Sequence, residues 1–207
     1  MLIGDNAAVL FQGDSITDGD RRRDDLDDLG NGYVSMAAAW FSALYPEKRV
    51  RFLNRGISGN RAADLRARWR TDCLDLKPTI VSILIGVNDT WRRYDSNDPT
   101  SVEAFEDNYR AILRQTISLG ATIVMGQPFL LPIPPDRIHW REDLEPKIDA
   151  TRKLAEEFKA IYIPYDEIFA KAGGRREPEF WAGDGVHPTS VGHALMAQSW
   201  LRACGAL

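Results

Sequence analysis

The stretch TIVSILI at residues 79–85 is the strongest strand signal in the chain, and it runs directly into the loop GVND at residues 86–89. A run that is apolar on both faces, apart from Ser82, is typical of a strand that other elements cover on both sides. We therefore expect this stretch to lie at the centre of a parallel sheet, with its carboxyl end opening onto a polar loop.

Shorter apolar runs and amphipathic stretches alternate on either side of this strand. Further strands are expected at residues 8–11, 50–53, 121–125 and 161–163. Helices are expected at residues 32–45, 62–76, 101–119, 146–159, 166–171 and 189–203, with Pro146 in the first turn of its helix. This alternation implies a parallel sheet with helices on both faces. Because right-handed crossovers place every strand-to-helix loop on one edge, residues that follow the strands should converge there.

Length and composition indicate an ordinary globular protein. At 207 residues the chain fits a single domain, residues 1–207. Its formal net charge of -4 gives no case for nucleic acid or a membrane as a partner. The first residues lack the basic and long apolar regions of a signal peptide, so we expect a cytoplasmic protein. Cys73 and Cys204 lack metal or redox spacing and are expected to be small buried apolar side chains.

The first strand run is followed by the sequence GDSIT at residues 13–17. Gly13 permits a tight turn, and Ser15 then lies at the carboxyl end of a strand, where open α/β sheets bind their ligands. On its own the sequence also fits a turn in which Asp14 and Ser15 satisfy nearby backbone N–H groups. Later stretches of the chain decide between these interpretations.

Ester hydrolysis needs a nucleophile, a base, a group that orients the base, and donors for the developing oxyanion. Ser15 is the candidate nucleophile and His187 the candidate base, since a neutral imidazole can accept the hydroxyl proton. Asp184, three residues before His187, can bond the other ring nitrogen. The Ser15 N–H, the Gly59 N–H and the Asn88 side chain would form the oxyanion hole. Each stretch alone also fits an ordinary turn or helix start, but together they favour catalysis.

The sequences GDSIT at 13–17, NRGISGN at 54–60, GVND at 86–89 and DGVHP at 184–188 resemble, in this order, the motifs of the SGNH hydrolase family. This family is also known as the GDSL esterases and lipases. Ile16 stands where the family often has leucine, a departure that should not affect the chemistry.

The resemblance implies a flavodoxin-like three-layer α/β/α sandwich around a five-stranded parallel sheet. By it, Ser15, Gly59, Asn88 and His187 are the name-giving residues and Asp184 completes a catalytic triad. It further implies hydrolysis of small ester or thioester substrates through an acyl-enzyme, with no metal or cofactor. The longer sequence around these motifs, including IGVNDTWR at residues 85–92, is similar to that of intracellular bacterial acetylxylooligosaccharide esterases. That similarity implies a short-chain acetyl esterase acting on carbohydrates.

Two other functions stay open at this point. The same machinery would serve a thioesterase or lysophospholipase that acts on longer acyl chains. A noncatalytic flavodoxin-like module could instead bind a phosphorylated ligand through the turn at residues 13–17. The second alternative lacks a GxGxxG or Walker pattern and leaves Asp184 and His187 without a role.

Aromatic side chains gather near the predicted catalytic edge, and flat aromatic faces suit a sugar ring or a short acyl group. We expect Trp91 and Trp181 to contact substrate and Trp140 to be a structural residue. Arg92 either binds a substrate hydroxyl or pairs with a nearby aspartate. His139 and His193 are expected to be structural, with His193 on the last helix.

The sequence FLLPIPP at residues 129–135 is unusually apolar for a loop. If it were exposed it would form a large patch, so we expect burial against a second subunit of a homo-oligomer, with a substrate lid as the alternative.

Overall fold

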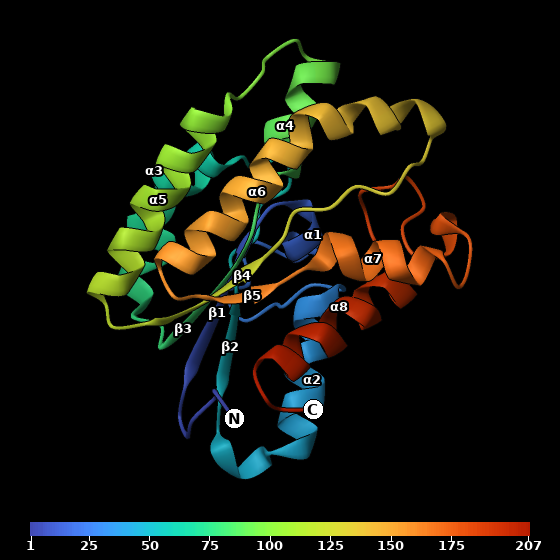
Figure 1. Ribbon diagram of the computed structural model, residues 1–207. Coiled ribbons are helices and arrows are strands. Elements are labelled where there is room, and N and C mark those ends of the chain that lie inside the picture. The colour runs from blue at the N-terminus through green and yellow to red at the C-terminus, as the bar shows by residue number, and fades with distance from the viewer.

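The computed structural model describes residues 1–207, except for the side chain of Asp136. Its centre is a parallel sheet in the order β2-β1-β3-β4-β5 (Figure 1). The strands are β1 (Ala8–Gly13), β2 (Arg51–Asn54), β3 (Ile80–Leu84), β4 (Thr122–Gly126) and β5 (Ile161–Ile163). The strand predicted from TIVSILI is therefore the middle strand of the sheet, as expected.

Helices cover both faces of this sheet, which makes three layers (Figure 1). One face carries α2 (Tyr33–Leu44), α7 (Tyr165–Gly173) and α8 (Ser190–Ala203), and the other carries α3 (Ala62–Asp72), α5 (Val102–Ser118) and α6 (Arg141–Glu157). Two further helices, α1 (Ser15–Asp18) and α4 (Val87–Asp95), directly follow β1 and β3. Short 3₁₀ turns are η1 (Pro46–Lys48), η2 (Leu74–Leu76), η3 (Pro135–Trp140) and η4 (Pro178–Phe180).

Alternate side chains of β3 enter the two cores. Ile80 and Leu84 pack on the side of α2 and α8, whereas Val81 and Ile83 pack on the side of α3 and α5. The hydroxyl of Ser82, the one polar side chain of the strand, accepts a hydrogen bond from the indole N–H of Trp200 at 3.0 Å. The polar atom in the middle of the sheet therefore has a hydrogen-bond partner, and its burial costs little free energy.

Three predicted elements differ from the structure. The helix predicted at residues 62–76 ends at Asp72, and residues 74–76 form the 3₁₀ turn η2. The sequence GVND does not form a loop, because α4 begins at Val87 and its buried residues include Asn88, Asp89 and Thr90. A helix whose buried side is polar inverts the usual pattern, so a search for apolar periodicity does not detect it. The helix predicted from residue 146 begins at Arg141, and Pro146 lies inside it.

Gly13, which the sequence predicts to form a tight turn, is instead the last residue of β1. A Cβ at this position would lie 2.4 Å from both the Leu84 carbonyl oxygen and the Thr17 hydroxyl. The missing side chain thus lets β1 pass close to β3 and α1, rather than allowing a turn.

The apolar stretch at residues 129–135 is largely covered by its own chain. Phe129, Leu130 and Leu131 are buried in the core beneath α2, α7 and α8, while Pro132 and Pro134 are exposed. The large exposed patch that would have required a second subunit is therefore not formed by these three residues. In the part of the chain that the structure describes, no helix is both long and apolar enough to span a bilayer.

Candidate active site

The predicted nucleophile, base and orienting carboxylate lie in a continuous hydrogen-bonded chain. Ser15 is the first residue of α1, and the loop before α8 carries Asp184 and His187. The Ser15 hydroxyl lies 2.9 Å from Nε2 of His187. On the other side of the ring, Nδ1 of His187 lies 2.7 Å from Oδ2 of Asp184. Donation from Nδ1–H to the carboxylate leaves Nε2 free to accept the serine proton.

Asp184 sets both the orientation and the basicity of His187. Its Oδ1 accepts the backbone N–H groups of Val186 at 3.0 Å and of His187 at 2.7 Å. Burial acts to raise the pKa of Asp184, but these bonds and the one from the His187 ring outweigh it, so the pKa lies below its ordinary value. The hydrogen bond to Asp184 raises the pKa of His187, although partial burial opposes this. His187 is thus a stronger base than a free imidazole.

Residues 131–137 hold the loop that carries Asp184 and His187 in place through hydrogen bonds and close backbone contacts. The Leu131 N–H donates to the carbonyl oxygen of Gly185 at 2.9 Å. Gly185 has a φ of 83°, and a Cβ there would lie 2.4 Å from the Ile133 carbonyl oxygen. The Arg137 guanidinium donates to the carbonyl oxygen of Asp184 at 2.5 Å. The backbone of the catalytic loop therefore has little freedom to move.

Arg137 also reaches the aromatic side chains, a role that sequence reasoning missed. Its guanidinium carbon lies 4.6 Å from the Trp91 ring centroid and 4.9 Å from that of Trp140. A cation over an aromatic face holds both groups in place. An arginine in an apolar, proline-rich stretch gives no local signal of its contacts with Trp91 and Asp184, because both of these residues are distant in the sequence.

The predicted oxyanion-hole residues follow three adjacent strands: Ser15 comes after β1, Gly59 after β2 and Asn88 after β3. Gly59 has a left-handed φ of 85°. The Asn88 side-chain N–H donates to the Asn60 carbonyl oxygen at 3.1 Å, which joins the start of α4 to the Gly59 loop. The Ile57 N–H donates to the Gly13 carbonyl oxygen at 3.1 Å, which joins the same loop to β1. The topology and these bonds bring the three positions together.

Two buried carboxylates lie next to these residues in the chain. Asp14 precedes Ser15, and one of its oxygens accepts the Ile16 N–H at 3.0 Å. Its other oxygen, Oδ2, is buried without a hydrogen-bond partner among the described residues. Asp89 follows Asn88 and accepts the Ala62 N–H at 3.1 Å. Burial raises the pKa of each carboxyl group to about 7.

The predicted substrate contacts are only partly brought to the triad. The Trp91 ring centroid lies 5.9 Å from that of His187. Arg92 forms an ion pair with Asp95, the second of the roles considered for it, and its Nη2 lies 3.4 Å from where a Cβ of Gly59 would be. Trp181 donates its indole N–H to the Arg176 carbonyl oxygen at 3.2 Å, so its polar edge is directed to its own loop.

Two of the three residues predicted to be structural, Trp140 and His193, are packed as expected, whereas His139 is exposed. Trp140 stacks on Tyr94 with ring centroids 4.9 Å apart. His193 lies on α8, and its Nδ1 accepts the Tyr33 N–H at 3.1 Å. Cys73 and Cys204 are free and buried, and burial raises the pKa of each thiol to about 12, so neither is a nucleophile.

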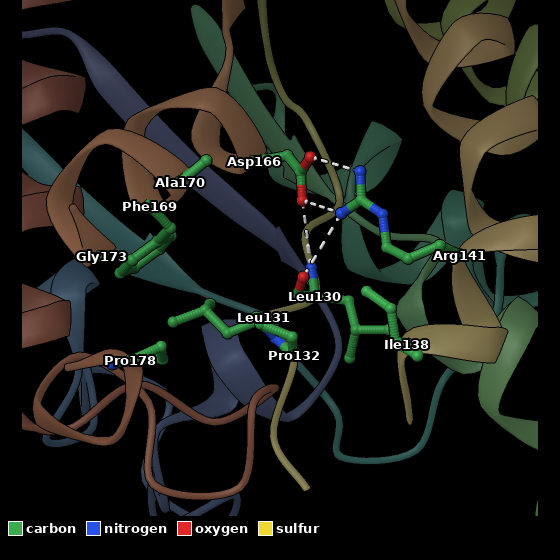
Figure 2. Close-up of a pocket in the computed structure, with 10 residues that line it drawn as sticks. All are labelled: Leu130, Leu131, Pro132, Ile138, Arg141, Asp166, Phe169, Ala170, Gly173 and Pro178. Atoms are coloured by element: carbon green, nitrogen blue, oxygen red, sulfur yellow. Dashed lines mark hydrogen bonds and ion pairs between the residues drawn. The ribbon is translucent and has the colours of Figure 1, made fainter. Parts of the chain in front are cut away.

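Two cavities lie in this region. One, of about 430 Å³, is lined by Ser15 and His187 themselves. The other, of about 380 Å³, lies beneath the loop between α6 and α7 (Figure 2). Figure 2 shows Arg141 and Asp166 directed toward one another at its edge, 2.7 Å apart, opposite apolar side chains that include Leu131 and Phe169. Only the first cavity contains reactive groups.

Comparison with known proteins agrees with this geometry. The model of the GDSL-like Lipase/Acylhydrolase family matches residues 11–195. An acetylxylan esterase of Geobacillus stearothermophilus is 35% identical over 99% of this chain and 97% of its own length. Three solved variants of that esterase, described as catalytic mutants, replace a serine, a histidine or an aspartate by alanine.

Solved structures match along the whole chain. The crystal structure of the same Geobacillus esterase, Axe2, superposes with a TM-score of 0.91 at 34% identity and covers 99% of this chain and 97% of its own. A Parabacteroides merdae protein described as GDSL-like reaches a TM-score of 0.95 at 36% identity, with 99% and 98% covered. The fold, the family match and these relatives exclude a noncatalytic module. The chain belongs to the GDSL-like lipase/acylhydrolase family and is a serine esterase, a hydrolase of carboxylic esters.

Proposed function

We propose that this esterase removes acetyl groups from carbohydrates of the acetylated xylooligosaccharide class, with Ser15, His187 and Asp184 as its catalytic triad. The observation that supports the chemistry most strongly is the chain from the Ser15 hydroxyl through the His187 ring to Asp184, with distances of 2.9 and 2.7 Å. These lengths are those of a nucleophile and base that are ready to exchange a proton.

In the first half of the reaction, Oγ of Ser15 forms a bond to the acetyl carbonyl carbon while its proton passes to Nε2 of His187. The negative charge on the carbonyl oxygen is stabilised by the N–H groups of Ser15 and Gly59 and by the Asn88 amide. Collapse of the tetrahedral intermediate breaks the ester bond, and His187 returns the proton to the sugar oxygen that leaves. Asp184 holds the ring and stabilises its positive charge between these steps.

In the second half, water attacks the acetyl group on Ser15. Its proton passes to Nε2 of His187 and then to Oγ of Ser15 as acetate leaves. Proton transfer in both directions requires a base that is neutral at the start of each step. The raised pKa of His187 keeps it a good proton acceptor, but it also means that the enzyme needs neutral or alkaline pH.

The substrate class is supported by the relatives and by the side chains beside the triad. The Geobacillus protein similar to this chain is described as an acetyl-xylooligosaccharide esterase. Trp91, 5.9 Å from His187, offers a flat face for a sugar ring. Arg92, beside Gly59, offers N–H donors for sugar hydroxyls in addition to its bond with Asp95. The structure gives less support to substrate binding by Trp181, because its indole N–H already donates a hydrogen bond within its own loop.

The test is acetate release from acetylated xylooligosaccharides, run beside aryl esters of increasing acyl length. We expect release from the sugar esters and a fall in kcat/KM from acetyl to octanoyl esters. A rise in kcat/KM with acyl length, together with no release from the sugar esters, would contradict the proposal and favour hydrolysis of longer acyl chains.

A further inference from the structure

The cavity of about 430 Å³ beside Ser15 and His187 has a second wall that the catalytic chemistry does not use. Asp20, Ser58 and His193 contribute to it, and each presents a polar group. Because both the nucleophile and the base line this space, a leaving group that receives its proton from His187 must lie in or next to it. The polar groups of the second wall therefore meet the leaving group.

The backbone of Asp20 is held in an unusual conformation at this wall. Gly19 caps α1 with a φ of 57°, and Asp20 repeats the left-handed conformation with a φ of 57°. Aspartate adopts this region at lower cost than most residues. Its carboxylate is exposed and receives no hydrogen bond from any group that the structure describes. It is thus free to accept hydrogen bonds from a bound molecule.

The neighbouring groups complement this acceptor. Nδ1 of His193 accepts the Tyr33 N–H at 3.1 Å, so Nε2 carries the ring proton and is a donor. Burial lowers the pKa of His193 to about 4, so the ring is neutral at neutral pH. The Ser58 hydroxyl donates to Asp18 at 3.1 Å, which leaves its lone pairs to accept. One donor and two acceptors on one wall match hydroxyl groups, each of which both donates and accepts.

The charge at this wall is negative. Among the described residues, no lysine or arginine lines the cavity. Of the arginines that follow Asp20, Arg21 is buried and donates to the Gly56 carbonyl oxygen, while Arg22 and Arg23 are ion-paired with aspartates of this region. Neither Ser58 nor a neutral His193 adds a positive charge. A leaving group that carries a phosphate or a carboxylate would face the Asp20 carboxylate without a compensating cation, which is unfavourable.

We infer that this cavity is the leaving-group subsite and that Asp20 is a specificity-determining residue, which selects neutral polyhydroxylated leaving groups over anionic ones. This inference rests on the proposed function, which it makes more specific. It predicts that the enzyme prefers a sugar ester to an acyl phospholipid or a coenzyme A thioester.

The test compares Asp20→Asn with the unchanged protein on four acetyl esters. Phenyl acetate reports the catalytic machinery alone, because its leaving group cannot donate to Asp20. Acetylated xylobiose reports recognition of hydroxyls, and acetylated methyl glucuronide, paired with its neutral glucuronamide, reports charge. Asparagine retains the left-handed backbone, and Asp20→Gly removes the side chain without strain, so both variants should fold.

For Asp20→Asn we expect kcat/KM on acetylated xylobiose to fall about tenfold, the effect of weakening a hydrogen bond to a charged group. Activity on phenyl acetate should stay within about twofold. The preference for the glucuronamide over the glucuronide should shrink about tenfold, since the repelling charge is gone. Asp24→Asn, which removes the same charge from an exposed position on the same loop, should change none of these values.

Equal losses on all four esters would overturn the inference, because they would indicate a general structural role for Asp20. Unchanged selectivity in both Asp20 variants would overturn it as well. If the unchanged protein hydrolyses phenyl acetate but no sugar ester, the proposed carbohydrate function itself fails, and the subsite assignment fails with it. These results are distinguishable, because the first two require measurable activity on acetylated xylobiose.

Discussion

Replacing Asp14 by asparagine should change how the stability of the protein depends on pH. Asp14 is 1% exposed and precedes Ser15, and one of its carboxylate oxygens is buried without a hydrogen-bond partner among the described residues. Burial raises its pKa from 3.8 to about 7. An asparagine in its place keeps an oxygen that can cap α1 by accepting the Ile16 N–H, but it has no charge to bury.

The sign and size of the expected change in the free energy of unfolding follow from this pKa. Because the folded protein holds the Asp14 proton more tightly than the unfolded chain does, its contribution to stability is fully present below pH 3.8 and is lost as pH rises through about 7. The complete loss is on the order of 4 kcal/mol. Between pH 5 and pH 8.5 it is about 2.5 kcal/mol. Asp89, whose pKa burial also raises to about 7, is present in both proteins, and repulsion from Asp14 is the smallest of the causes that shift it, so most of its contribution cancels from the comparison.

Urea denaturation at pH 5 and pH 8.5 measures this difference. We expect the free energy of unfolding of Asp14→Asn, relative to that of the unchanged protein, to be about 2.5 kcal/mol larger at pH 8.5 than at pH 5, so that the variant gains relative stability as pH rises. Asp24→Asn, an exposed control, should show no such change. A difference between the Asp14 variant and the unchanged protein that is the same at both pH values would refute the reasoning.

Three further changes act on the catalytic site. Asn88→Ala should lower kcat by about 10² to 10³-fold through loss of an oxyanion donor, and an unchanged kcat would count against that role. Gly185→Ala should lower both the melting temperature and kcat/KM, because the added Cβ meets backbone oxygens and φ is left-handed, a strain of about 1–3 kcal/mol; unaltered thermal unfolding would disprove the close contact. Asp184→Asn should lower kcat about 10⁴-fold. It should also move the rise of activity with pH to lower pH, because Asp184 raises the pKa of His187 and the neutral ring is the active form; an unmoved pH profile would exclude that coupling.

The sheet and the proximity of Ser15, Asp184 and His187 could be predicted from the sequence because their signals are local. The run at residues 79–85 is apolar on both faces, and the motifs that carry Ser15 and His187 are short and contiguous. Parallel topology then brings separate motifs to one edge without further information. The structure places the Ser15 hydroxyl and the Asp184 carboxylate each within hydrogen-bond distance of the His187 ring, in the order that the sequence predicts.

What the sequence did not reveal depends on burial or on distant contacts. The start of α4 was missed because Asn88 and Asp89 are polar yet buried. The contact of Arg137 with the backbone of the catalytic loop joins residues 47 apart in the chain, and no local pattern marks it. Likewise, the raised pKa of Asp14 arises from burial, which only the folded chain reveals.

The central claim is that Ser15 is the nucleophile of an acyl-enzyme mechanism, and steady-state kcat of Ser15→Ala on phenyl acetate at pH 8 tests it most directly. The Oγ of Ser15 lies 2.9 Å from the only ring nitrogen of His187 that Asp184 leaves free. Removal of this oxygen should therefore lower kcat by about 10⁴-fold or more, with an unchanged circular dichroism spectrum. A folded Ser15→Ala protein that hydrolyses the ester at the rate of the unchanged enzyme would contradict the account.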